Sequence, residues 1–184
     1  MVDKIYNETK NHMQKTVDHY QKEISKIRTG RASGAMLDSV QVDYYGTPQP
    51  LKNLSHISIP EPQLIVITPF DPSSLEMIES SIISADLGMN PNNDGNVIRL
   101  NIPALTEERR KELVKFLHQI IEEGRVSIRN IRREGNDQIK KMQNEENLSE
   151  DNVKIELDNI QDLTNEFIEK LNGLQSDKEK EIMD

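Results

Sequence analysis

The placement of proline is the strongest constraint on how this chain of 184 residues can fold. All eight prolines lie between positions 48 and 103, and both flanks contain none. Proline removes a backbone donor and clashes inside a helix, so long helices are possible only outside this middle segment. Five of the eight glycines lie between positions 30 and 104 as well. We therefore expect residues 30–104 to form one unit, and residues 1–29 with 105–184 to form another.

Both flanks carry the apolar spacing of amphipathic helices, with steps of three and four residues. The first helix is expected to stop at Gly30, the second to follow Thr106, and the third to follow Ser149 as N-cap, with fraying from Gln175. The expected seams are Ile5, Thr9, Met13, Val17, Tyr20, Ile24 and Ile27; Leu113, Leu117, Ile120, Gly124, Ile128, Ile131, Gly135, Ile139 and Met142; and Val153, Leu157, Ile160, Thr164, Phe167, Leu171 and Leu174.

The second seam contains Gly124 and Gly135. Each glycine costs about 1 kcal/mol of helix propensity, so both indicate the close approach of a neighbouring helix. At about 1.5 Å per residue this helix would be nearly 60 Å long. The expected fold is therefore α+β: an elongated three-helix bundle built from both ends of the chain, with an inserted small β/α/β domain. Two connecting segments would join the bundle to the insert as a hinge. They are Thr29, Gly30 and Arg31, and Pro103, Ala104 and Leu105.

Within the insert, alternating apolar residues predict strands near 40–44, 54–59, 64–68 and 97–102. Turns are expected at 45–48 and 90–95 because both segments contain Gly and Pro. A short helix capped by Asp71 should lie between the last two strands and end at Gly88.

The composition argues against several classes of function. The chain has no Cys, so disulfides, thiolate metal sites and Cys nucleophiles are excluded, and a cytoplasmic location is the default. No run of apolar residues is long enough for a bilayer. The four His residues lack metal-ligand spacing, and no nucleotide-binding or hydrolase motif occurs. We expect no catalytic residues, no metal and no cofactor.

The net charge of −9 suggests at first that nucleic acid is excluded. The position of the charges reverses this interpretation, because residues 107–143 carry ten bases and seven acids while residues 144–184 carry four and 13. At about 100° per residue, one sector of the second helix contains a stripe of bases beside the seam. The stripe comprises Arg125, Arg129, Arg132, Arg133 and Lys140. Arginine suits bidentate phosphate contacts, so RNA is a candidate ligand.

Several sequence segments resemble the ribosome recycling factor family of bacteria. They are Ser25-Lys26-Ile27-Arg28-Thr29-Gly30-Arg31-Ala32-Ser33, Tyr44-Tyr45-Gly46-Thr47-Pro48, Asp86-Leu87-Gly88-Met89-Asn90-Pro91-Asn92, Leu105-Thr106-Glu107-Glu108-Arg109-Arg110-Lys111 and Val126-Ser127-Ile128-Arg129-Asn130-Ile131-Arg132-Arg133. The resemblance covers essentially the whole chain.

This resemblance implies a tRNA-like, non-enzymatic factor that binds the large ribosomal subunit after peptide release and is driven by elongation factor G and GTP to split the ribosome. It implies that Arg129 and Arg132 contact rRNA, with Arg28, Arg31, Arg110 and Arg133 as companions, and that the insert faces elongation factor G. It also implies a monomer. A helical scaffold or coiled-coil chaperone, in which the arginines are ordinary solvated charge, and a non-ribosomal RNA-binding module are the alternatives.

Overall fold

The computed structural model describes residues 2–184, apart from the side chain at position 146, and divides the chain into two compact units. One unit comprises the chain up to Arg28 together with Glu107–Asp184, and the other comprises Thr29–Thr106. The fold is α+β, with long helices in the first unit and a small sheet domain in the second, as expected.

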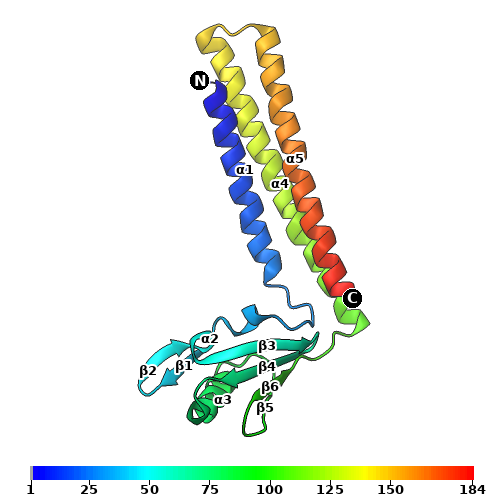
Figure 1. The fold of residues 1–184 in the computed structure, drawn as a ribbon. Helices are drawn as coiled ribbons and strands as arrows, with labels where there is room; N and C mark the ends of the chain where they lie inside the picture. The colour runs from blue at the N-terminus through cyan, green and yellow to red at the C-terminus, as the bar shows by residue number, and fades with distance from the viewer. Residues whose placement is uncertain (1) are drawn as a thin grey trace. The chain divides into compact units, whose positions relative to one another are not determined.

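Three helices form the first unit and lie side by side (Figure 1). They are α1 (Val2–Ser25), α4 (Glu107–Glu146) and α5 (Glu150–Met183). The bundle core contains Met13, Leu117, Ile121, Ile128 and Phe167, which are all fully buried. These side chains come from all three helices, so the two ends of the sequence depend on one another for their apolar contacts.

Most of the predicted seam residues are buried, and the exceptions are informative. On α4 Ile121, which is not a predicted seam residue, is fully buried, whereas Ile120 is only partly buried, as are Ile131 and Met142. On α5 Leu163 is buried as well. Because α4 packs against both α1 and α5, its buried sector is wider than a single stripe.

The helix ends differ from the predictions in two places. Helix α1 ends at Ser25, five residues before Gly30, and the chain continues through turn hydrogen bonds from Lys26 and Ile27. Helix α5 continues to Met183 rather than fraying from Gln175, because Ile182 is fully buried. The Ser149 cap is confirmed: its hydroxyl accepts a hydrogen bond from the Asn152 amide at 3.3 Å.

The second unit contains two sheets. A hairpin pairs β1 (Gln41–Tyr44) with β2 (Thr47–Pro50), and a four-stranded antiparallel sheet has the order β3-β4-β6-β5, with β3 Ser55–Glu61, β4 Leu64–Pro69, β5 Pro91–Asn93 and β6 Ile98–Asn101. The helices are 3-10 turns η1 (Gly34–Leu37) and η2 (Pro72–Ser74), α2 (Leu51–Leu54) and α3 (Leu75–Ser84). Ile78 and Ile82 of α3 share one core with Ile65, Ile67 and Ile98 of the sheet.

Two strands begin within predicted turns, and one helix ends early. Strands β2 and β5 both contain proline, which is compatible with pairing on one side only, as in a hairpin strand or a sheet edge. The turn between β1 and β2 is only Tyr45-Gly46, both with positive φ, as in a two-residue hairpin loop. Helix α3 ends at Ser84, and Asp86 with φ 46° takes the left-handed position before Gly88.

Candidate nucleic-acid interface

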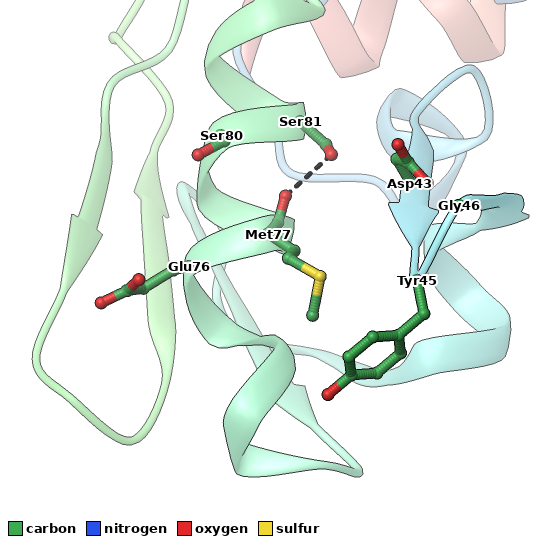
Figure 2. Close-up of a pocket in the computed structure, with 7 residues that line it drawn as sticks. All are labelled: Asp43, Tyr45, Gly46, Glu76, Met77, Ser80 and Ser81. Carbon is green, nitrogen blue, oxygen red and sulfur yellow. Dashed lines mark hydrogen bonds between the residues drawn. The ribbon is translucent and has the colours of Figure 1, made fainter.

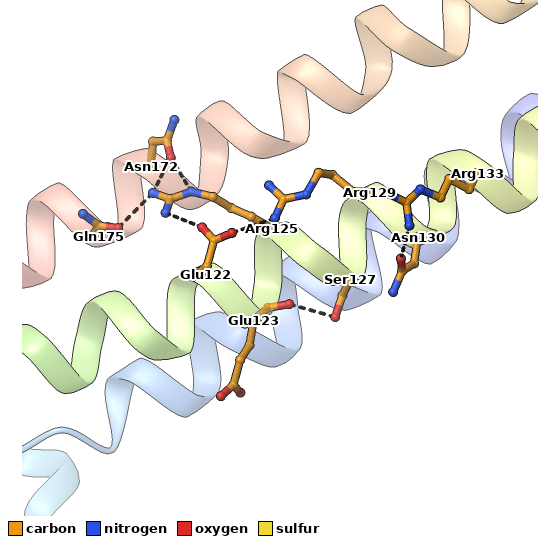
Figure 3. Close-up of polar contacts among 9 residues, drawn as sticks. All are labelled: Glu122, Glu123, Arg125, Ser127, Arg129, Asn130, Arg133, Asn172 and Gln175. Atoms are coloured by element: carbon orange, nitrogen blue, oxygen red, sulfur yellow. Dashed lines mark hydrogen bonds and ion pairs between the residues drawn. The ribbon is translucent and has the colours of Figure 1, made fainter.

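Helix α4 carries the predicted arginine stripe, and the neighbouring α5 determines how each arginine is held. Arg125 donates to the Asn172 side-chain oxygen from Nε (3.0 Å) and Nη2 (2.7 Å), and to Gln175 from Nη2 (2.9 Å). Its Nη1 pairs with Glu122 at 3.1 Å. Figure 3 shows this cluster, and the Arg125 side chain is only 23% exposed. An arginine has five N–H donors, so most of those of Arg125 are engaged between α4 and α5.

Glu122, an acid, also lies within the basic stripe and was not among the residues predicted there. Its carboxylate also pairs with Arg129 Nη2 at 2.6 Å (Figure 3). The hydrogen bonds from Arg129 and then Arg125 lower the pKa of Glu122, so this carboxylate stays charged near neutral pH. The spacings from Glu122, three residues to Arg125 and seven to Arg129, are those of one helix face and could have revealed it.

The other stripe residues differ in how much of their side chain is available. Arg132 donates from Nη1 to Gln161 of α5 at 3.0 Å, and its buried Nε has no hydrogen-bond partner among residues 2–184. Arg133 is exposed and, among the residues that the structure describes, its side chain has only a long 3.5 Å hydrogen bond to Asn130. Lys140 is exposed and forms no ion pair within the described part of the chain. The stripe therefore has a solvent-facing edge at Arg133 and Lys140 and an anchored edge at Arg125 and Arg132.

The three remaining predicted arginines lie outside this stripe. Arg110, near the start of α4, donates from Nη1 to the backbone oxygen of Met183 at the last turn of α5. A cation in this position is favourable because a helix ends in unsatisfied carbonyls. Arg28 and Arg31 are exposed and follow α1, one on each side of the boundary between the two units.

The predicted hinge residues border the same boundary. Gly30 has φ 73°, and a Cβ built on it would lie 3.0 Å from the Leu105 side chain. Gly30 therefore satisfies two requirements, a left-handed backbone and close packing, that a residue with a larger side chain would violate.

The second unit contains a pocket without basic residues (Figure 2). It lies between the β1–β2 turn and α3 and is lined by Asp43, Tyr45, Gly46, Glu76, Met77, Ser80 and Ser81. Two of these residues are acidic and none is basic, so the pocket would repel a phosphate. Among residues 2–184 there is also no cluster of His, Asp and Glu side chains that could hold a metal ion, and no helix that could cross a bilayer.

Comparison with known proteins identifies this arrangement. The family model described as "Ribosome recycling factor" matches residues 20–183. A ribosome-recycling factor of Bacillus licheniformis is 46% identical over 184 residues, covering all of both chains, and one of Staphylococcus epidermidis is 49% identical over 179 residues, covering 97% of each.

Two solved structures are similar over almost the whole chain. A solution structure of a ribosome recycling factor has a TM-score of 0.76 at 44% identity, covering 99% of this chain and 97% of that one. Models of the T. thermophilus ribosome recycling factor and the E. coli elongation factor G bound to the E. coli post-termination complex give a TM-score of 0.66 at 44% identity, covering all of both chains. The sequence match and the shared fold together show that this chain belongs to the ribosome recycling factor family.

Proposed function

We propose that this chain binds the post-termination ribosome and, with elongation factor G and GTP, splits it into subunits. The single observation that supports this most strongly is the full-length match to ribosome recycling factors at 44–49% identity. Family members are non-enzymatic translation factors, which agrees with the absence of any catalytic motif in the sequence. We propose that it acts in the cytoplasm and without a cofactor of its own.

The arginine stripe of α4 is the proposed contact with rRNA of the large subunit. Arg129, Arg132 and Arg133 would bind phosphates, because each retains donors beyond those used within the bundle. Arg125 has a different proposed role. Since its hydrogen bonds to Asn172 and Gln175 tie α4 to α5, it would hold the stripe in position. Arg28, Arg31 and Arg110 are proposed as additional contacts.

The insert is proposed to face elongation factor G, with the hinge at Thr29–Arg31 and Pro103–Leu105 transmitting its movement. The helix seams support a monomer, because α1, α4 and α5 bury their apolar faces against one another within one chain. A scaffold or chaperone would need those faces for a partner. Size-exclusion chromatography with light scattering tests this, and a stable dimer would contradict it.

The proposed function is tested by mixing the protein with post-termination ribosomes, elongation factor G and GTP, and following subunit separation by light scattering. No separation, under conditions in which a known recycling factor is active, would refute the proposal.

The RNA contact is tested by Arg129→Glu with Arg132→Glu. The slope of log affinity against log salt concentration is negative, and each lost phosphate contact should make it shallower by about 1. Large-subunit binding should weaken at least about tenfold. The matched control is Arg109→Glu, because at about 100° per residue Arg109 lies on the opposite side of α4. Unchanged binding by the double variant would refute the assignment.

A further inference from the structure

A pocket at one end of the helical bundle lies outside the arginine stripe. It lies between the beginning of α4 and the end of α5, has a volume of about 410 Å³, and is lined by Lys111, Val114, Lys115, His118, Glu179 and Met183. Val114 and Met183 supply apolar surface. The His118 ring nitrogen Nε2 lies 3.1 Å from a Glu179 carboxylate oxygen, which fixes the imidazole at the wall of the pocket.

The walls of this pocket are well held. Ile182 is fully buried in the bundle, and the carbonyl of Met183 accepts a hydrogen bond from Arg110. Both contacts keep the last turn of α5 against α4, so the pocket does not depend on a loose terminus. Met183 itself is 51% exposed, so part of this residue remains accessible to a ligand.

The charge of the pocket rim is complementary to a phosphate backbone. Lys111 and Lys115 are exposed and form no ion pair or hydrogen bond within residues 2–184. Glu179, the one acid among the lining residues, is engaged with His118. The rim therefore presents two lysines whose charges are not neutralised by a contact within the chain.

The pocket also lies on the same side of α4 as the arginine stripe. Lys111 and Arg129 are 18 residues apart, which is five turns of an α-helix, so they project from the same side of α4 about 27 Å apart. Lys115 and Arg133 repeat this relationship. One face of α4 thus carries the pocket at one end and the arginines further along.

We propose that this pocket binds an unstacked nucleobase of ribosomal RNA, with Lys111 and Lys115 contacting its flanking phosphates. The proposal rests on the function proposed above and adds a second, base-binding contact to it. Proteins bind unstacked bases by stacking them on aromatic rings, including imidazole, and the phosphates that accompany the base supply the charge that the lysines match. An acidic peptide would also match the lysines, but the pocket shares its side of α4 with the arginines proposed to bind rRNA, so RNA is the ligand that fits the whole face.

The absence of Cys from the chain permits a direct test. Met183→Cys introduces a single thiol at the pocket, which can be labelled with a photoactivatable cross-linker and mixed with large ribosomal subunits. Phe116→Cys is a matched control, because Phe116 is equally exposed at 51% but lies about 140° from Lys111 around α4. We expect a cross-link to RNA from position 183 and little or none from position 116. A cross-link from position 183 to protein alone, or equal RNA cross-linking from both positions, would refute the proposal.

A second measurement does not depend on the label. Lys111→Gln with Lys115→Gln should weaken large-subunit binding about tenfold. The slope of log affinity against log salt concentration should become shallower by about 2. The control pair is Lys52→Gln with Lys154→Gln, which removes two exposed lysines elsewhere. If the wild type does not bind large subunits, the proposed function fails. If the wild type and the control pair bind equally and the Lys111, Lys115 variant binds as well as they do, only the pocket assignment fails.

Discussion

Gly135, in the interior of α4, allows a quantitative test of how closely the helices pack. A Cβ on Gly135 would lie 2.9 Å from Thr9 Oγ1 of α1 and 3.1 Å from Ile160 Cδ1 of α5. Gly135→Ala would gain about 1 kcal/mol of helix propensity, but inserting a methyl group into a tightly packed core costs about 1–3 kcal/mol. We expect the free energy of unfolding to fall by up to about 2 kcal/mol.

Gly173 provides the matched control within the same bundle. It lies in the interior of α5, is exposed, and has nothing within 4 Å of an added Cβ. Gly173→Ala should therefore stabilise the protein by about 0.5–1 kcal/mol, because only the propensity gain remains. Urea unfolding followed by far-ultraviolet circular dichroism measures both variants. Equal stabilisation by both substitutions would refute the close-packing argument.

A double-mutant cycle identifies the atom responsible. Thr9→Ala removes the hydroxyl that the new methyl group would contact, so the combination with Gly135→Ala should be less destabilising than the sum of the two single changes. If the two effects simply add, the contact with Thr9 does not limit the packing at this position.

Four further predictions concern other parts of the molecule. Glu122→Gln should strengthen large-subunit binding, measured by affinity at fixed salt, because it removes the carboxylate that competes for Arg129; weaker binding would contradict this. Ser149→Ala should lower the free energy of unfolding by about 1 kcal/mol through loss of the N-cap, measured by urea unfolding, and an unchanged value would contradict it. Gly30→Val should leave RNA binding intact but slow subunit splitting in the light-scattering assay, since Gly30 has positive φ; equal splitting rates would contradict it. The pKa of Asp94 is lowered to about 2, first by the Val97 amide and then by Arg99 and the Asn96 amide, so its contribution to folding stability is present above its ordinary pKa of 3.8 and is lost as pH falls from about 4 towards 2. Asp94→Asn should therefore lose less stability than the wild type over that pH range, measured by acid unfolding. Parallel stability curves for the two proteins would contradict this.

The helices were predictable from sequence because their signals are local and repeated. Apolar residues every three or four positions predicted all three, and the absence of proline permitted their length. The choice between Ile120 and Ile121 could not be made in this way. Both fit a helical spacing, and only packing against two neighbouring helices decides which is fully buried. Strands β2 and β5 were missed because an edge position, which tolerates proline, is a property of the assembled sheet.

In the candidate site, too, the local pattern was predictable from sequence and the contacts between helices were not. The arginines could be placed on one face of α4 by counting residues, but their partners Gln161, Asn172 and Gln175 belong to α5 and lie 29 to 50 residues away in the sequence. No local pattern connects an arginine to an amide at that separation. The distinction between an anchoring arginine and an available one therefore required the structure.

Glu122 and the amide anchors together change what the stripe can do. A row of unpaired arginines would attract any polyanion, because phosphate attraction does not depend on sequence. Here one carboxylate already pairs with two of the arginines, and the α5 amides hold two of them against the bundle. An incoming RNA must displace or bypass these contacts, so a few random phosphates gain little while a surface that matches the whole face gains several contacts at once. Together with the net charge of −9, this arrangement favours one shaped RNA site over indiscriminate binding along nucleic acid.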